Sequence, residues 1–236
     1  MRAAPEIPAA EREELQQRAA VIHERLIHFY GAAAWEDTPS ALEVLVSTIL
    51  SQNTNDRNRD LAYRELEQRF SSWEAVRDAP AEEVIDAIRG AGLANQKGPR
   101  IQAVLCEITR ERGSLDLSFL AKLPREEAEG WLRRFKGIGP KTAAIVLNFS
   151  LGIPAFPVDT HIYRVTGRIG LRPPKMSVED AHRFLEGLFQ PAWYTADHLN
   201  LIHLGREICT ARRAYCERCP LVDVCDTGRK TRIPLS

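Results

Sequence analysis

The stretch "KGIGPKTAAIV", residues 136–146, decides how the rest of this chain is interpreted. Gly137 and Gly139 flank one apolar residue, Ile138, and a helix-like run begins at Pro140. Glycine permits a positive φ and a close backbone approach, and proline suits the first turn of a helix. The stretch predicts a helix, a tight hairpin and a second helix, whether as an ordinary corner or as a site. Free N–H groups at such a hairpin can bind an anion, and on a duplex that anion is a phosphate.

Lys141 directly follows this proline and has two interpretations. The common one is a solvated charge at a helix start. A helix N-terminus is, however, unfavourable for a cation, and partial burial lowers the pKa of an amine, whose neutral form is a nucleophile. Eighteen residues later, "FPVDTHIYRV" supplies Asp159, which we expect to cap the next helix. A capping role would also fix its carboxylate in place. The neighbouring His161 is either a packed or capping histidine, or a base.

The hydrophobic pattern along the chain is helical almost throughout. Residues 10–30 are expected to form an amphipathic helix, and Ser40 is expected to cap a second one. No run alternates strictly over five or more residues, so we predict no strand. The fold class is all-α, with about ten short helices. Four glycines are expected at helix ends, namely Gly90, Gly92, Gly113 and Gly137.

Composition and charge limit the function classes. The 236 residues are 44% hydrophobic and 27% charged, as in ordinary soluble proteins, and no apolar run approaches the ~20 residues of a membrane span. The N-terminal sequence resembles neither a signal nor a transit peptide, so we expect a cytoplasmic protein without membrane association. Net charge is zero, yet residues 131–175 carry eight Lys or Arg against one acid. This segment is either a solvated basic face or a binding surface for a polyanion.

Four of the five cysteines lie close together near the C-terminus, with the spacing C-x6-C-x2-C-x5-C. They are Cys209, Cys216, Cys219 and Cys225. Disulfides are unfavourable in a reducing compartment, so the spacing indicates a metal site. Zinc and a [4Fe–4S] cluster are both candidates, and spacing alone favours zinc. The fifth, Cys106, is predicted to be a buried core thiol.

Together these features resemble the endonuclease III family, the iron–sulfur DNA glycosylases of the helix-hairpin-helix superfamily. The resemblance rests on "GIGPKTA", on "VDTHIYRV" with its aspartate eighteen residues after the lysine, and on the cysteine spacing. It covers about residues 35–230 and includes "LSQNTND" (50–56) and "GLANQKGPRI" (92–101), which resemble the two DNA-wedge loops of the family.

The resemblance implies a two-domain fold. Residues 34–153 would form a six-helix domain containing the helix-hairpin-helix. Residues 1–33 and 154–236 would form a discontinuous domain with a C-terminal cluster loop. DNA and the active site would lie in the groove between the domains, with Lys141 from the first and Asp159 from the second. The family also carries a [4Fe–4S] cluster, mainly structural, which reverses the preference for zinc.

The implied activity is that of a bifunctional DNA glycosylase and AP lyase in base excision repair. A damaged base, expected to be an oxidised pyrimidine, would be flipped out of duplex DNA. Lys141 would attack C1′, displace the base and form a Schiff base, after which β-elimination nicks the strand. Asp159 would help to deprotonate the lysine and stabilise positive charge on the sugar. The protein is expected to act as a monomer associated with the nucleoid.

The family pattern also implies the DNA contacts. Leu93 matches the leucine that enters the base stack, and Asn53 occupies the place of a glutamine that is one methylene longer. Ala94 replaces an aromatic residue, and Pro140 replaces a basic one. These departures leave the chemistry intact but affect lesion range and affinity. The remaining expected contacts come from the hairpin, the histidine and the cluster loop, namely Gly137, Ile138, Gly139, His161, Arg212 and Arg213.

Three alternatives stay open at this stage. The first is another enzyme of the superfamily, acting on mismatched uracil, thymine or adenine. Lys141 argues against the adenine enzymes, which lack this lysine, and against most thymine enzymes, although some lysine-bearing members act on mismatches. The second is a non-catalytic damage-binding protein, against which both Lys141 and Asp159 argue. The third is a zinc module unrelated to DNA.

Overall fold

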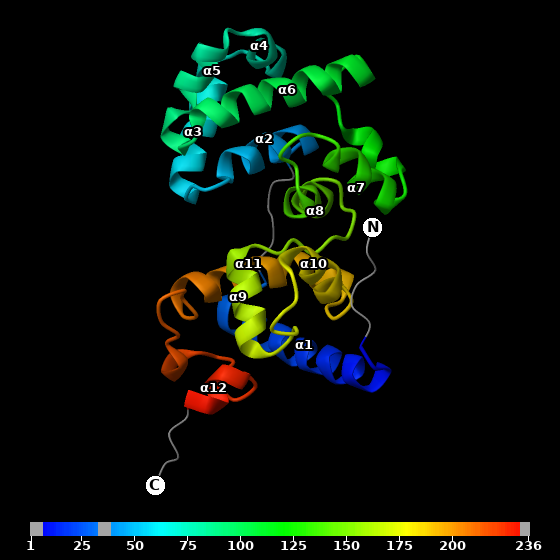
Figure 1. Cartoon of the computed structure of the whole chain (residues 1–236), viewed down its shortest axis with the longest axis vertical. Coiled ribbons are helices and arrows are strands. Elements are labelled where there is room, and N and C mark those ends of the chain that lie inside the picture. Colours follow the sequence, from blue (N-terminus) through cyan, green and yellow to red (C-terminus); the bar gives the residue numbers. More distant parts are fainter. Residues whose placement is uncertain (1–6, 33–38, 232–236) are drawn as a thin grey trace. The chain divides into compact units, whose positions relative to one another are not determined.

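The computed structural model describes residues 7–32 and 39–231, and all regular elements in this part of the chain are helical. The predicted all-α class is therefore confirmed; the one β-type contact among these residues is an isolated bridge between Cys209 and Ala214. The chain divides into two compact units, one of residues 38–153 and one of residues 1–37 and 154–236 (Figure 1). The predicted domain boundary at residue 34 lies outside the described residues. No helix in the described ranges is both long and apolar enough to cross a membrane.

The unit of residues 38–153 is built around α2, in which eight of the eleven residues are buried. Figure 1 shows α6 on one side of α2 and α8 on the other, and α2 contacts both. Ser40 caps α2 as expected, since its hydroxyl accepts from the N–H of Glu43 while that carboxylate accepts from the N–H of Ser40. The elements are α2 (Ala41–Ser51), α3 (Asp56–Arg69), α4 (Trp73–Asp78), α5 (Ala81–Ala87), η1 (Arg89–Ala91), α6 (Ala94–Arg112), η2 (Ser118–Lys122), α7 (Arg125–Arg133) and α8 (Pro140–Phe149).

The second unit joins the N-terminal helix to the C-terminal third of the chain. Its helix α11 packs against α1 and α9, and α9 also packs against α12. Residues 10–30 are helical as predicted, within α1. The elements are α1 (Ala9–Tyr30), α9 (Thr160–Ile169), α10 (Val178–Glu186), η3 (Pro191–Trp193), α11 (Tyr194–Glu207), η4 (Cys216–Arg218) and α12 (Asp226–Thr231).

Helix α1 holds the cysteine-rich segment in place through two arginines. The Arg18 guanidinium donates to the carbonyl of Val224 at 2.9 Å. About two turns further along α1, Arg25 Nη2 donates to Asp223 Oδ2 at 2.8 Å. These bonds join parts of the chain about two hundred positions apart, with separations of 206 and 198 residues. The first and last described segments are therefore one structural unit.

A buried carboxylate lies between α1 and α11. Asp197 is 0% exposed, and its Oδ1 is 2.8 Å from His23 Nδ1. The His23 ring stacks on Trp193 with centroids 4.2 Å apart. Burial raises the pKa of Asp197 to about 6, and the hydrogen bond with His23 opposes that rise.

Two expectations about single residues are wrong. Cys106 is exposed, because it lies about 100° around the α6 helix from its buried neighbour Leu105. Gly90 lies inside η1 rather than at a helix end. By contrast, Gly113 ends α6 in the left-handed conformation, with φ 74°, as predicted.

Candidate active site and metal centre

The glycine hairpin connects α7 to α8 within one unit. Its apolar residues Phe135 and Ile138 are 2% and 4% exposed and anchor the turn in the core. Gly137 has a φ of +86°, which favours glycine, and Gly139 is the N-cap of α8. Within the described residues, no backbone hydrogen bond uses the N–H of either glycine. These two donors are the groups in the turn that could bind a phosphate.

Ile138 itself offers no donor for DNA. Its side chain is buried, and its N–H donates to the carbonyl of Phe135 at 3.0 Å. Ile138 therefore has a structural role in which it holds the two glycines in position, and its DNA contact stays a prediction.

Lys141 lies in the first turn of α8, directly behind the hairpin, and Pro140 occupies the start of the helix as predicted. The Lys141 side chain is half-buried, and the next three residues of α8 are buried in the core of the unit. The position of its Cα is thus fixed by a packed helix. The partly buried amine therefore starts from a fixed backbone position at the N-terminus of α8.

Asp159 is the N-cap of α9, as predicted. Its Oδ1 accepts from the N–H of Ile162 at 2.7 Å. The three residues before it are buried, and the segment is tied down by two histidines: the Val158 N–H donates to His182 Nδ1 at 3.2 Å, and His198 Nδ1 lies 2.9 Å from the Pro157 carbonyl. The carboxylate is therefore held by a rigid segment on one side and by its own cap on the other.

His161 lies in the first turn of α9 and is half-buried. Its Nδ1 is 3.2 Å from Arg164 Nη2. A Cβ at Gly205 of α11 would lie 2.9 Å from the His161 Cβ, so the two helices pack closely here. This environment gives His161 a packing role in α9, alongside the expected DNA contact.

The two expected wedge residues have an unusual conformation in common. Among the described residues other than glycine, only Asn53 and Leu93 have a positive φ, at 53° and 52°. Both side chains are exposed, and Leu93 exposes 47% of its surface. A non-glycine residue in this region costs roughly 1–2 kcal/mol, and such strain gathers at functional sites. The structure thus presents an apolar side chain to solvent on a strained backbone, where folding alone gives no reason for it.

Sequence analysis did not identify three residues that support the segments around Asn53 and Leu93, namely Gln52, Lys97 and Arg100. Lys97 of α6 is 1% exposed, and its Nζ donates to the carbonyls of Leu50 and Ala91. Arg100 and Gln52 form a second set of bonds, in which Arg100 Nη1 donates to Gln52 Oε1 at 2.7 Å. Lys97 lies four residues before the buried Ile101, and this position on the apolar face of α6 was the available signal.

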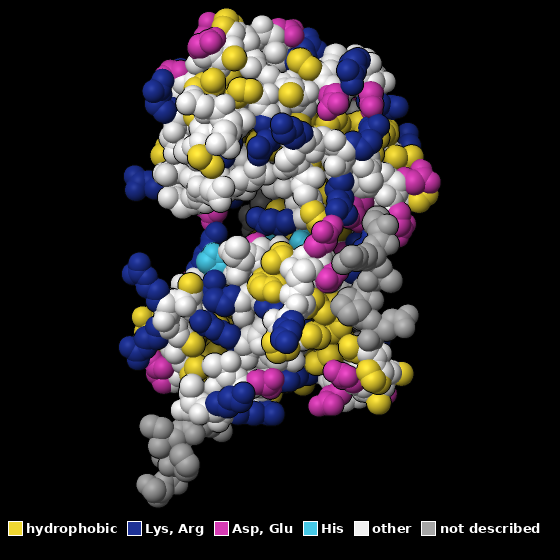
Figure 2. All heavy atoms as spheres, in the orientation of Figure 1, with side chains coloured by type: hydrophobic (Ala, Val, Ile, Leu, Met, Phe, Trp, Pro, Cys, Tyr) yellow, Lys and Arg dark blue, Asp and Glu magenta, His cyan; other side chains and the backbone are white. Residues whose placement is uncertain are grey.

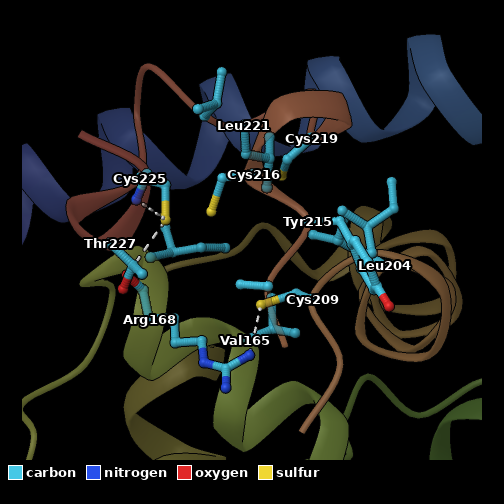
Figure 3. A pocket seen from close by; sticks show the side chains of 15 residues that line it. Val165, Arg168, Leu204, Cys209, Tyr215, Cys216, Cys219, Leu221, Cys225 and Thr227 are labelled. Carbon is cyan, nitrogen blue, oxygen red and sulfur yellow. Dashed lines mark hydrogen bonds between the residues drawn. The ribbon is translucent and has the colours of Figure 1, made fainter. Parts of the chain in front are cut away.

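The four clustered cysteines line one apolar cavity, together with residues of α9 and α11 (Figure 3). Two of their sulfur atoms accept hydrogen bonds. Arg168 Nη1 lies 3.3 Å from Cys209 Sγ, and the N–H of Gly228 lies 3.4 Å from Cys225 Sγ. Burial raises the pKa of Cys219 to about 11 and also raises the pKa of Cys225.

This donor set fits a thiolate-bound metal. Thiols that are costly to ionise alone are deprotonated by a coordinating metal ion, and Arg168 adds a positive charge beside them. In the described part of the chain, no three His, Cys, Asp or Glu side chains are grouped closely enough for a single metal ion. The common feature of the four cysteines is therefore the cavity that they line.

Hydrogen bonds within the loop between Cys209 and Cys216 stabilise its conformation. Thr210 Oγ1 donates to the Arg213 carbonyl at 2.7 Å and accepts from the Arg213 N–H. Arg168 donates to the Thr210 carbonyl at 2.6 Å. Arg212 and Arg213 are exposed. Figure 2 shows Lys and Arg side chains grouped over α9 and this part of the chain, which makes a rigid, positively charged surface.

Comparison with known proteins identifies the class. Residues 46–191 match the HhH-GPD superfamily base excision DNA repair protein family, and the chain belongs to that superfamily. Endonuclease III of Sulfolobus acidocaldarius is 31% identical over 194 residues, which cover 80% of this chain and 82% of the relative. Endonuclease III of Bacillus subtilis is 31% identical over 188 residues, with the same coverage of both chains. These relatives place the protein among the DNA glycosylases and AP lyases.

A protein of Arabidopsis thaliana is 40% identical over 134 residues, which make up 57% of this chain and only 46% of the plant protein. Among solved structures, a non-covalent Endonuclease III–DNA complex matches with a TM-score of 0.78 and 26% identity, covering 91% of this chain and 97% of the other. A trapped Endonuclease III–DNA covalent intermediate matches with a TM-score of 0.79 and the same identity and coverage. The expected family is therefore confirmed.

Proposed function

We propose that this protein is a bifunctional glycosylase that removes oxidised pyrimidines from duplex DNA and then cleaves the abasic strand through a lysine Schiff base. The observation that carries the proposal is Lys141, a half-buried amine in the first turn of α8, directly behind a hairpin with two available N–H donors. A trapped covalent intermediate is described for an Endonuclease III with a closely similar fold. A covalent intermediate requires a nucleophile, and Lys141 is the candidate in this chain.

The proposed reaction has two steps. The neutral Lys141 amine attacks C1′ of the flipped nucleotide, and the N-glycosidic bond breaks with its electron pair leaving on the base, which takes up a proton. The amine, now bonded to C1′, loses one proton with help from Asp159. The C1′–O4′ bond then breaks, O4′ takes up a proton, and the protonated Schiff base forms. Loss of a C2′ proton then breaks the C3′–O bond, so the 3′ phosphate leaves. Water hydrolyses the Schiff base and regenerates Lys141.

The proposed DNA contacts are of two kinds. Some bind backbone phosphates and position the duplex, and others fill the space left by the flipped nucleotide. The N–H groups of Gly137 and Gly139 would bind a backbone phosphate, and Arg212 and Arg213 would bind others. Leu93 and Asn53 would occupy the space left by the flipped nucleotide, which offsets part of the cost of unstacking. The exposure of the Leu93 side chain supports this proposal.

We also propose that the cysteine cavity holds a [4Fe–4S] cluster through Cys209, Cys216, Cys219 and Cys225. The cluster would supply a structural crosslink for the loop of residues 210–215 rather than a reaction step. Arg168 then has a double function, because it bonds both a cysteine sulfur and the loop carbonyls. The monomeric state and the cytoplasmic, nucleoid-associated location stay predictions.

Borohydride trapping tests the function. The purified protein is incubated with duplexes containing thymine glycol, dihydrouracil, an abasic site, or uracil or thymine opposite guanine, and the covalent adducts are counted. We expect adducts with the two oxidised pyrimidines and the abasic site. Adducts on the mismatches alone would assign the protein to mismatch repair, and the absence of any adduct would remove the lyase assignment.

A further inference from the structure

Lys97 has an environment that is rare for a lysine. It is 1% exposed in the core of its unit, and its Nζ donates to the Leu50 carbonyl at 2.7 Å and to the Ala91 carbonyl at 2.8 Å. Within the described residues, no carboxylate forms an ion pair with it. A buried ammonium without a counter-ion is costly, so the position calls for an explanation beyond packing.

The two carbonyls that it binds are both at the ends of helical elements. Leu50 is in the last turn of α2 and Ala91 is the last residue of η1. Carbonyls in the last turn lack an N–H partner within their own helix and carry the negative end of the helix dipole. One buried cation therefore satisfies two helix C-termini at once.

These helix ends lead directly into the two strained loops. Asn53 follows Leu50 by three residues, and Leu93 follows Ala91 by two. Both carry the left-handed backbone conformation described above. Lys97 thus joins the bases of the two loops and fixes the separation between them.

The next turn of α6 extends the connection to the hairpin. Arg100 Nη1 donates to Gln52 Oε1 at 2.7 Å, and Gln52 Nε2 donates to the Gly137 carbonyl at 3.1 Å. Lys97 and Arg100, on one face of α6, therefore bond to the segments that carry both wedge residues, and Gln52 extends the connection to the Gly137 turn. The three segments are far apart in sequence and share this single support.

We propose that Lys97 is a positioning residue that sets the spacing of Asn53 and Leu93 and so controls how effectively they enter the base stack. The inference rests on the proposed function only in taking these two residues to be the wedge. Burial, and then the charge of Arg100, lowers the pKa of Lys97, while the two carbonyls favour its ammonium form. Its role is indirect, since it acts through the loops and does not contact DNA.

The test uses a duplex that needs no catalysis. It contains a tetrahydrofuran abasic analogue opposite 2-aminopurine, whose fluorescence rises when it loses its stacking partners. Lys97→Met keeps the length of the side chain and removes the charge, and Lys122→Met, on the exposed end of η2, is the matched control. Affinity for an undamaged duplex and the melting temperature are measured in parallel.

We expect Lys97→Met to lower the fluorescence response about tenfold or more, as misplacement by about 1 Å does in other sites, while undamaged-duplex affinity changes less than about twofold. In a Leu93→Ala background, Lys97→Met should have little further effect, because the loop through which it acts is already disabled. Lys122→Met should match the wild type. If Lys97→Met does not fold, Lys97→Gln replaces it, since its amide can still donate to one carbonyl and should give an intermediate loss.

Three outcomes would overturn the inference: no fluorescence response from the wild type, an unchanged response in the folded variant, or losses that simply multiply with Leu93→Ala. The last would show a general structural effect. A wild type that responds to the analogue but forms no borohydride adduct would refute the proposed lyase function and leave the role of Lys97 intact.

Discussion

Arg100 lies against the backbone of Gly137 so closely that a Cβ on the glycine would be 2.6 Å from the Arg100 Nε. The turn therefore depends on this glycine both for its φ of +86° and for space. We predict that Gly137→Ala lowers the free energy of unfolding by about 2 kcal/mol or more. Thermal unfolding should show this as a fall in melting temperature of about 4–8 °C.

Gly139→Ala is the matched control in the same turn. Gly139 has a φ of −93°, and a Cβ there would meet no atom within 4 Å. Its cost should stay below about 1 kcal/mol. Arg100→Ala in the Gly137→Ala background should recover the part of the loss that comes from the contact. Equal losses from the two glycine variants would contradict this account of the turn.

Lys141→Gln should abolish borohydride trapping on every substrate, with adduct formation reduced by at least about 10³-fold. The substitution removes the amine and keeps a side chain of similar size, so folding and the absorbance of the proposed cluster should be unchanged. Lys136→Gln, an exposed lysine before the same hairpin, serves as the control and should trap normally. Adducts that persist in Lys141→Gln would identify another amine as the nucleophile.

Asp159 has an observed role as a helix cap and a proposed catalytic role, and the two can be separated. Asparagine retains the cap on the Ile162 N–H, so Asp159→Asn should change stability by less than about 0.5 kcal/mol. It loses the carboxylate, so the single-turnover rate of base release should fall by about 10²- to 10⁴-fold.

Asp159→Ala should lose the cap as well, at a cost of about 1 kcal/mol. Ser177→Ala removes a comparable cap from α10, where Ser177 Oγ accepts from the Asp180 N–H, and should lower stability without changing the rate. Turnover by Asp159→Asn at the wild-type rate would remove Asp159 from the mechanism.

The features that could be predicted from sequence are those with local causes. The helical pattern of residues 10–30, the caps at Ser40 and Asp159 and the start of α8 at Pro140 depend on neighbours in the chain, and the structure contains all four. Cys106 was misassigned because proximity in sequence to Leu105 was taken for proximity on the helix face.

The features that escaped prediction depend on contacts across long separations. One of the two bonds of Lys97 reaches Leu50, 47 residues away, and the only local signal of its burial was its position on the apolar face of α6. The hydrogen bond of Ile138 to Phe135 is local instead, but it depends on how the turn closes. The residues that build the site are therefore more predictable than those that support it.

Cys225→Ser should prevent binding of the proposed [4Fe–4S] cluster. It takes away one of the four cavity thiols, so we expect loss of iron, sulfide and the absorbance near about 400 nm, with a lower melting temperature. Cys106→Ser changes the exposed cysteine on α6 and should keep the iron, the sulfide and the absorbance. Wild-type protein that contains one zinc ion and no iron would contradict the cluster proposal and favour a zinc site.

The buried carboxylate of Asp197 should make stability depend on pH. Its pKa in the folded protein is about 6, above the ordinary value of 3.8, so between these values the folded state binds more protons than the unfolded state. Stability from this group is present at low pH and is lost as pH rises through about 6, a change of about 1 kcal/mol between pH 5 and pH 7. Asp197→Asn cannot titrate and lacks this loss. The melting temperature of Asp197→Asn relative to the wild type should therefore rise by about 2–4 °C from pH 5 to pH 7, and a constant difference would show that Asp197 does not titrate in this range.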